Sequence, residues 1–524
     1  MLKLLHLKLP YLYSNINPSY SPQISFNNMS ILLVFITLLL PWLIKKYLFN
    51  FSHHVKKNKP PSPPKLPVIG NLHQLSPLTH RALQTLGAKH GPVMLLHFGS
   101  KPVVVIQSAD AAAQILKEHD LVFSDKPHTS STRRLLYDLK DVMIAPYGEY
   151  WRMLKSICVL QLLSNKRVKS YKFIREEETD LLLERIGSCC LSGSAVDLSQ
   201  LFDLHSNNVI CRASFGRRFG EGESGRRFTM ALRELFRLMV TVEIGEFVPW
   251  LSWVSRVNGF YKRVDKVREE LDEYLEMVVE EHITRGIESG DGNKSKENFV
   301  DILLKDSSID RDGIKGILLD MLAGGTDTTS STLEWAMTEL IRNPTVRTKL
   351  QTEVREIVQD RHVITDDDLG KMQYLKAVIK ETLRLRAPVS LLGRETREDI
   401  TVMGYKISAN TLVVVNTWAI GRDPACWEQP EMFHPERFLN SSLDFKGHDF
   451  KFAPFGHGRR GCPGAALAIA SVELVLANLV HKFEWKLPMG AKCEDLDVLE
   501  QPGVSLHRKN PLLVVPTHRQ YNML

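Results

Sequence analysis

Residues Phe455-Gly-His-Gly-Arg-Arg-Gly-Cys-Pro-Gly464 decide how this chain folds. The one cysteine, Cys462, lies among four glycines and two arginines, and an apolar run from Ala465 to Leu479 follows. Glycines let a backbone adopt positive φ and come close to a large flat group. We expect backbone amides and the charges of Arg459 and Arg460 to lower the pKa of the Cys462 thiol, which favours a metal-binding thiolate. A glycine-rich loop before a helix, with an incidental cysteine, is the alternative that composition leaves open.

The spacing narrows the choice, because Phe455-x-x-Gly458-x-Arg460-x-Cys462-x-Gly464 resembles the haem-binding signature of the cytochrome P-450 superfamily at every signature position. The resemblance implies that the Cys462 thiolate is the axial ligand of the iron of haem b. It also implies that Phe455, Gly458, Arg460 and Gly464 shape the cofactor site. A structural zinc site needs several close Cys or His ligands, and a single histidine lies near Cys462. Haem-thiolate binding is therefore the interpretation we favour.

A second motif lies inside a predicted helix from Arg311 to Arg342, which stops before Asn343-Pro344. Its centre reads Ala323-Gly-Gly-Thr-Asp-Thr-Thr329, and each glycine costs a helix about 1 kcal/mol relative to alanine. Gly324 and Thr328 are four residues apart and share a face, so a flat ligand could approach Gly324 beside the Thr328 hydroxyl. A bent, buried helix whose threonines bond back to its own carbonyls is the alternative.

This segment is similar to the family's oxygen-activation motif. The resemblance implies that Gly324 and Gly325 lie against the haem and that Thr328 and Asp327 are catalytic, handling the protons of oxygen activation. A haem isomerase or dehydratase of the same fold, which needs no reductase, usually lacks this acid–alcohol pair. A non-catalytic haem-binding protein would not need the motif at all. We keep both as alternatives.

The scaffold beneath the haem is predicted from Glu381-Thr-Leu-Arg384, on a predicted helix from Tyr374 to Leu385. Two opposite charges three residues apart are common on helix surfaces, so this pattern alone says little. Phe433-His-Pro-Glu-Arg-Phe438 follows at the distance expected in the family. The resemblance therefore implies a buried triad of Glu381, Arg384 and Arg437 that locks the loop carrying Cys462.

The resemblance also implies that Trp151, Arg152, Lys155 and Arg394 contact the haem, and that the cations among them hold its propionates. Trp151-Arg152-Met-Leu-Lys155 resembles the family's Trp-x-x-x-Arg helix, and Arg394 matches another propionate-binding arginine. Lys155 stands where arginine is usual, so it would act as a point charge without the bidentate fork. Arg386-Ala-Pro388 also departs from the usual His-Pro-Pro, which affects the expected shape of the pocket wall 387–392.

Charge is distributed unevenly along the chain, whose net charge is +7. No Asp or Glu precedes Asp110, whereas that stretch holds eleven Lys and Arg residues. The basicity of this segment suggests an anionic membrane surface and not nucleic acid. The seven cysteines are scattered and odd in number, which favours a reducing compartment over a disulfide framework.

An apolar run from Ile31 to Ile44 is shorter than the roughly 20 residues of a usual span, but residues 47–51 extend it if Lys45 and Lys46 snorkel. We expect an uncleaved single-pass anchor at 29–50 in the endoplasmic reticulum membrane, because no small-residue cleavage site of a signal peptide follows. The lysines after it predict a cytosolic catalytic domain. Residues 1–28 form an extension, and a chain begun at Met29 would resemble an ordinary signal anchor. A proline-rich hinge at 51–69 and a haem-thiolate catalytic domain at 70–524 complete the predicted organisation.

The remaining pattern predicts a mainly α protein with small β-sheets. Strands are expected at 93–98, 103–106, 412–415 and 511–515, and long helices at 174–186 and 264–287. The fold implied is that of a cytochrome P-450, a single large haem domain with an N-terminal membrane anchor.

The anchor, the hinge and both motifs resemble plant A-type microsomal members of the superfamily. That resemblance implies a monooxygenase that uses molecular oxygen and oxidises a medium-sized, mostly apolar metabolite such as a terpenoid, alkaloid or coumarin. Electrons would come from NADPH through a separate NADPH–cytochrome reductase, or through cytochrome b5, because the chain has no flavin or nicotinamide fingerprint. Membrane lipid is a further expected partner and nucleic acid is not. Ser390, Leu391 and Val504 are the expected substrate contacts.

Overall fold

The computed structural model of the protein describes residues 58–218, 222–241, 243–288, 297–445 and 449–519. The predicted extension 1–28, the anchor 29–50 and the first part of the hinge lie outside the described residues. So does the loop 289–296, for which the sequence predicts a surface link.

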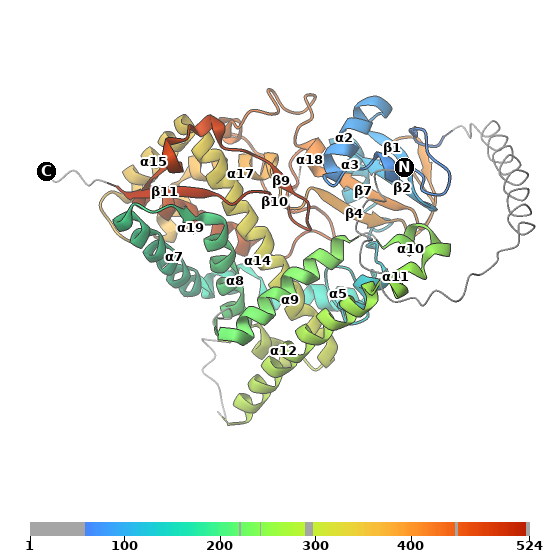
Figure 1. Cartoon of the computed structure of the whole chain (residues 1–524), viewed down its shortest axis with the longest axis horizontal. Helices are drawn as coiled ribbons and strands as arrows, with labels where there is room; N and C mark the ends of the chain where they lie inside the picture. Colours follow the sequence, from blue (N-terminus) through green and yellow to red (C-terminus); the bar gives the residue numbers. More distant parts are fainter. Residues whose placement is uncertain (1–57, 219–221, 242, 289–296, 446–448, 520–524) are drawn as a thin grey trace, which may run out of the picture. The chain divides into compact units, whose positions relative to one another are not determined.

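Helices make up most of the described chain, which confirms the predicted mainly α fold (Figure 1). They are α2 (Thr79–His90), α3 (Ala109–Ala113), α4 (Ser130–Leu135), α5 (Glu149–Ile157), α6 (Asn165–Ser170), α7 (Lys172–Ser192), α8 (Leu198–Phe215), α9 (Gly222–Val240), α10 (Ile244–Phe247), α11 (Val254–Val257), α12 (Phe260–Glu288), α13 (Phe299–Leu304), α14 (Arg311–Arg342), α15 (Pro344–Val358), α16 (Asp366–Lys371), α17 (Gln373–Leu385), α18 (Thr417–Ile420) and α19 (Ala465–Lys482).

The strands form four small sheets. They are β1 (Val93–Phe98), β2 (Lys101–Ile106), β3 (Val196–Asp197), β4 (Leu391–Glu395), β5 (Ile400–Val402), β6 (Tyr405–Ile407), β7 (Leu412–Asn416), β8 (Phe483–Lys486), β9 (Glu500–Gln501), β10 (His507–Arg508) and β11 (Leu513–His518). The largest sheet has the order β1-β2-β7-β4, with β2 and β7 parallel and the other two pairs antiparallel. The others are β3-β11-β8, β5-β6 and β9-β10.

Helix α14 runs through the middle of the described body (Figure 1). Its bounds are those predicted, because Asp310 caps the first turn by accepting a hydrogen bond from the Gly313 amide, and Asn343-Pro344 follows its last residue. It packs against α8, α17 and α19. Residues 313–323 and 329–341 are buried on every side, so amphipathic periodicity is absent from most of this helix.

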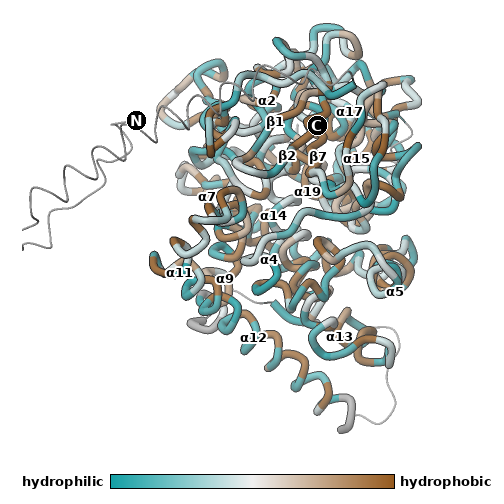
Figure 2. Tube along the Cα trace, turned by 90° about the vertical axis from the view of Figure 1, so that its right-hand side faces the viewer, coloured by the Kyte–Doolittle hydropathy of each residue, from teal (hydrophilic) through white to brown (hydrophobic). Residues whose placement is uncertain are grey.

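Helix α12, in contrast, is amphipathic, with buried and exposed residues alternating along it. In Figure 2 the tube along α12 alternates between hydrophilic and hydrophobic segments, as the sequence predicts for 264–287. Helix α19 is apolar and long enough to cross a membrane, but 61% of it is buried inside the described body, where it packs against α14 and α15. Its hydrophobicity is therefore that of a core helix.

The described half of the predicted hinge is docked on the body and does not run free as a spacer. The Leu95 amide of β1 donates a 2.8 Å hydrogen bond to the Pro61 carbonyl. The Asn71 side chain, which is buried, donates to the carbonyls of Pro63 and Pro64 at 3.4 and 3.3 Å. Because proline has no amide hydrogen, Pro61, Pro63 and Pro64 make these contacts through their carbonyls.

One close approach on α14 gives a test of the packing. A Cβ built at Gly316 would lie 2.1 Å from the carbonyl oxygen of Lys140, a backbone atom that cannot move aside cheaply. We expect Gly316→Ala to lower the free energy of unfolding by about 1–3 kcal/mol or more through overpacking. Gly370→Ala is the matched control, because a Cβ at Gly370 on α16 meets nothing within 4 Å. Equal thermal unfolding midpoints for the two variants would contradict the packing of α14 on this loop.

Candidate active site

The loop before α19 is folded around Cys462. The Cys462 amide donates a 2.9 Å hydrogen bond to the Phe455 carbonyl, which closes the loop into a tight ring. Gly456 and Gly458 adopt φ values of +68° and +69°, where glycine is favoured. A Cβ at Gly458 would also lie 2.3 Å from an Asp120 carboxylate oxygen, so two independent constraints require glycine there.

The centre of α14 and the loop before α19 are accessible, although the two helices pack against each other. Gly324 is exposed and residues 325–328 are partly exposed, although α14 is buried on both sides of this window. A Cβ at Gly324 would meet nothing within 4 Å, and one at Gly464 would approach only the Cys462 sulfur, at 3.9 Å. Cys462 is itself exposed, yet enough protein surrounds its thiol for burial to be the main influence on its pKa. Cys462 and the centre of α14 are therefore accessible parts of two otherwise packed elements.

The electrostatics of Cys462 differ from the sequence expectation. Burial raises the pKa of the Cys462 thiol, and this effect outweighs the hydrogen bonds from the Gly464 and Ala465 amides and the charge of Lys155, which lower it. The arginines of the loop are engaged elsewhere, since Arg459 pairs with Asp120 at 2.6 Å. Ionisation of this thiol therefore requires a further positive charge, which a bound metal ion supplies.

Four cations lie close to one another near Cys462 without carboxylate partners. They are Lys126, Lys155, Arg394 and Arg460, and within the described ranges none of them forms an ion pair with a carboxylate. Burial, and then repulsion from neighbouring cations, lowers the pKa of both Lys126 and Arg460. Arg394 is 2% exposed, and its guanidinium donates only to the carbonyl of Gly393, at 2.9 Å. Such a cluster fits a dianionic group, as the two propionates of a haem would provide.

Two of these cations also hold the cysteine loop to α5. The Lys155 ammonium donates a 2.5 Å hydrogen bond to the Gly461 carbonyl. Arg460 donates to the carbonyls of Ser124, Val142 and Ala145. Its guanidinium also lies 4.2 Å from the ring centre of the buried Trp151.

Arg152 is placed differently from its prediction. It is exposed, and its guanidinium lies over the ring of Tyr147 at 5.8 Å. Trp151 points inward, so the next residue of the helix, turned by about 100°, points outward. Lys126 joins the cluster in its place, and its sequence context gave no signal for this role.

The two adjacent glycines at the centre of α14 have different surroundings. A Cβ at Gly324 would meet nothing within 4 Å, whereas a Cβ at Gly325 would lie 2.8 Å from the side chain of Ile210 on α8. Gly325 therefore permits helix packing, and the structure does not place it toward a cofactor. The Thr328 hydroxyl donates a 2.6 Å hydrogen bond to the Gly324 carbonyl, at the edge of the accessible window.

Asp327 has a partner that the sequence did not suggest. Its carboxylate lies 3.0 Å from Nε2 of His507 on β10. Burial would raise the pKa of Asp327, but the hydrogen bond and the charge of His507 outweigh it and hold that pKa below its usual value. The residues are 180 positions apart, so no local pattern could have indicated the pair.

The predicted triad is assembled, with Glu381 and Arg384 fully buried and Arg437 partly buried. The Arg384 guanidinium makes two hydrogen bonds to the Glu381 carboxylate, at 2.7 and 2.8 Å, and neither side chain is exposed. Arg437 donates to the same carboxylate at 3.1 Å, and so does the His434 amide at 2.7 Å. The Glu381 charge is thus shared among two guanidiniums and a backbone amide.

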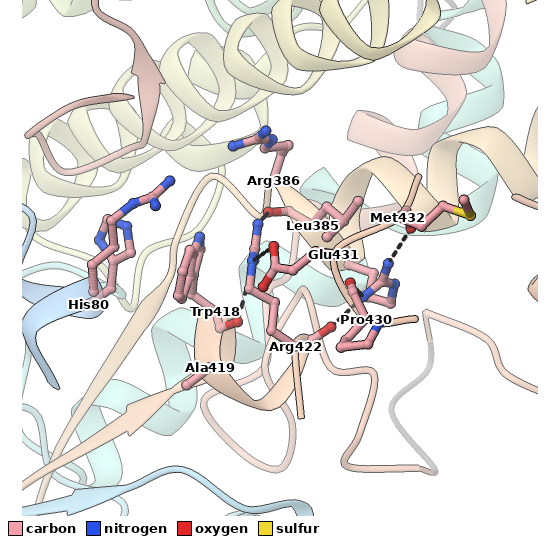
Figure 3. Close-up of polar contacts among 12 residues, drawn as sticks. His80, Leu385, Arg386, Trp418, Ala419, Arg422, Pro430, Glu431 and Met432 are labelled. Carbon is pink, nitrogen blue, oxygen red and sulfur yellow. Dashed lines mark hydrogen bonds and ion pairs between the residues drawn. The ribbon is translucent and has the colours of Figure 1, made fainter. Parts of the chain in front are cut away.

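Arg422, which lies outside the triad, joins three nearby parts of the chain (Figure 3). The buried Arg422 donates to the Leu385 carbonyl at 2.7 Å and to the Glu431 carboxylate at 3.2 Å. Its guanidinium also lies 3.8 Å from the ring centre of Trp418. These contacts tie the end of α17 to α18 and to residue 431.

A chain of aromatic rings leads from the triad to the cysteine loop. Arg384 lies 5.1 Å from the ring centre of Trp427. Successive ring centres are then 5.8, 5.0, 6.0 and 5.9 Å apart along Trp427, Phe438, Phe452, Phe445 and Phe455. The triad thus supports the Cys462 loop through packed aromatic rings.

The expected substrate contacts have different surroundings. Ser390 is buried, and its carbonyl accepts a 3.0 Å hydrogen bond from the Thr417 hydroxyl. Leu391 packs beside the cluster of Leu83, Met94, Leu96, Val103 and Val105. Val504 is partly exposed and lies two residues before Leu506, whose amide bonds to the Pro388 carbonyl of the wall 387–392 at 2.9 Å. The shape of that wall also depends on Arg386, which pairs with Glu339 at 2.9 Å and Glu500 at 3.3 Å.

An accessible cysteine, a cluster of cations without carboxylate partners and an accessible turn at Gly324 are the features that a haem-thiolate site would require. The profile of the family described as Cytochrome P450 matches residues 60–515. The chain is 52% identical over 498 residues to Cytochrome P450 736A117 of Prunus mume, covering 93% of this chain and 95% of that protein. It is 49% identical to the tabersonine/lochnericine 19-hydroxylase of Catharanthus roseus, over 92% of this chain and 98% of the other. A solved zebra fish cytochrome P450 superposes with a TM-score of 0.72 at 24% identity, over 84% of this chain and 99% of that chain.

The chain belongs to the cytochrome P450 family, and it is a plant-type P450 monooxygenase. Membership in the family implies a haem-thiolate, a redox partner and a small-molecule substrate.

The triad gives a direct test of the scaffold. We expect Arg437→Ala to destabilise the buried Glu381 charge by about 3–5 kcal/mol and to abolish haem incorporation. The measurement is the reduced-CO difference spectrum per mole of purified protein. Arg256→Ala is the control, because Arg256 is exposed. Normal haem content in the Arg437 variant would refute the role of the triad.

Proposed function

We propose that this monooxygenase inserts oxygen into a medium-sized, mostly apolar plant metabolite, with haem b bound through Cys462. The observation that supports the proposal is the accessible window at residues 324–328 of the otherwise buried α14, which contains an acid and an alcohol, together with the accessible Cys462. An isomerase or a non-catalytic haem protein would not need proton-handling groups at this position.

Each part of the site then has a task that its geometry supports. Cys462 would ligate the iron, with the Cys462–Phe455 hydrogen bond holding the loop in place. Lys126, Lys155, Arg394 and Arg460 would bind the propionates. When bound, the haem supplies the redox chemistry that activates molecular oxygen.

The side chains of α14 would handle the protons. The Thr328 hydroxyl is held by the Gly324 carbonyl, so its oxygen keeps a lone pair directed away from the helix and able to accept or relay a proton. Asp327 is ionised and lies within the same window. The apolar residues around the window limit the water that reaches these groups.

The substrate class rests on relatives and on composition. One relative is named for 19-hydroxylation of tabersonine and lochnericine, which supports a plant metabolite as the substrate of this chain. The loop at Val504 and the wall 387–392 are the segments we propose to contact it. A terpenoid, an alkaloid or a coumarin would fit these expectations.

Electrons would come from NADPH through a separate reductase, with cytochrome b5 as a second donor, at the endoplasmic reticulum membrane. The body carries exposed apolar residues that support contact with lipid. Trp250 is 65% exposed, Trp253 56% and Val257 72%, all within α10–α11 and the turn between them. Tryptophan is enriched where a protein meets a membrane interface.

The test is mass spectrometry of products from microsomes that contain this protein, a plant reductase and a panel of terpenoids, coumarins and alkaloids. We expect a product that gains one oxygen atom and that requires NADPH. A reduced-CO spectrum establishes that the haem is intact. Conversion without NADPH would instead identify an isomerase, and a product of unchanged oxygen content would indicate desaturation or ring coupling.

A further inference from the structure

His507 lies between two carboxylates of α14. Its Nε2 is 3.0 Å from Oδ1 of Asp327, and its Nδ1 is 3.3 Å from Oε2 of Glu334. The two acids are seven residues apart, which is two helical turns, so they project from the same face of α14. An imidazole that faces a carboxylate at each nitrogen can donate to both only when it is doubly protonated.

The Glu334 side of this bridge is rigid. Glu334 is 3% exposed, and its carboxylate accepts hydrogen bonds from the Ser199 hydroxyl and from the Arg508 amide, the latter at 3.0 Å. The neighbouring residue Leu506 is fixed as well, because its carbonyl accepts from Ser331 and Trp335 at 2.8 and 2.6 Å. His507 is therefore anchored at one nitrogen and along its backbone, and its other nitrogen points at Asp327.

The acidic groups that surround His507 favour a cationic imidazole. A third acid, Asp203 of α8, accepts a hydrogen bond from the Ser330 hydroxyl and acts electrostatically on the same group. Of the cations nearby, the Arg508 guanidinium is turned toward the Asp497 carbonyl at 2.6 Å, and Arg233 acts on Asp203. Burial alone would lower the pKa of His507, but Asp327 and Glu334 raise it to about 10.

We propose that His507 is a positioning residue for this monooxygenase, whose imidazolium holds the Asp327 carboxylate ionised and oriented at the accessible window of α14. The proposal rests on the acid role of Asp327 proposed above. It makes the C-terminal loop, which also carries Val504, part of the proton-handling apparatus. Loss of the cation would free the Asp327 side chain and raise its proton affinity, without removing any group that contacts the substrate.

The first experiment measures the charge of His507 without turnover. Diethyl pyrocarbonate modifies histidine only when its imidazole is neutral. Peptide mass spectrometry reports the extent of modification at each histidine of the full-length holoenzyme. Near neutral pH we expect His507 to react at least about tenfold more slowly than the exposed His362, and to become reactive only as pH rises toward about 10. Asp327→Asn should speed the reaction of His507 while leaving His362 unchanged. Unaltered reactivity of His507 in that variant would overturn the proposed ion pair.

The second experiment separates positioning from structural support. We expect His507→Gln to lower the fraction of NADPH electrons recovered in product about tenfold or more, with an unchanged substrate dissociation constant and a normal reduced-CO spectrum. In the Asp327→Asn background the same change should add nothing, because His507 acts through Asp327. His362→Gln is the matched control. A weaker substrate affinity with unchanged coupling would show that His507 only supports the loop, and would overturn the proposal.

The two proposals fail differently. Full coupling in Asp327→Asn would remove the acid role of Asp327, and the positioning role of His507 with it. Full coupling in His507→Gln beside an uncoupled Asp327→Asn would remove the positioning role alone.

Discussion

The ion pair of Glu381 with Arg384 is the interaction on which the rest of the site depends. Both side chains are fully buried, so their charges are stable only while every partner is in place. Arg384 extends the pair by donating to the carbonyls of Pro430 and Met432 at 2.7 and 3.1 Å, and Arg437 joins from the other side. These hydrogen bonds fix residues 430–432, which have no regular secondary structure. The aromatic rings from Trp427 to Phe455 then carry this rigidity to the loop of Cys462.

The charges of the triad are paired, whereas the cations near Cys462 have no carboxylate partners among the described residues. Lys126, Lys155, Arg394 and Arg460 repel one another, and burial strengthens that repulsion by excluding water. The thiol of Cys462 is also disfavoured as an anion until a metal is present. A haem would remove both costs, since it would offer two carboxylates to the cations and an iron to the sulfur. Its binding would then contribute to folding stability in the way that any ligand bound only by the native state does.

The sequence predicted what local chemistry controls. The bounds of α14 follow from an Asp cap and a terminal Asn-Pro, and the strands β1 and β2 follow from two short apolar runs on either side of the turn at Gly99. Residue roles that depend on where a side chain points were less predictable from the sequence. Arg152 and Gly325 both lie inside recognisable motifs, yet one helical step turns each of them toward a different neighbour. Lys126 and His507 carry no motif at all, because their partners are brought to them only by the tertiary fold.

Helix α14 combines a local sequence that disfavours helix with tertiary packing that stabilises it. Gly324 and Gly325 weaken the helix locally, and a threonine that bonds to the carbonyl four residues back tends to bend it. The helix survives because its flanks are buried on every side, so packing supplies what its central sequence lacks. His507 adds a tie across the weak region, since it spans from Asp327 in the accessible window to Glu334 in the buried flank. The same contact that steadies the opened turn of the helix thus also fixes the charge and direction of the acid within it.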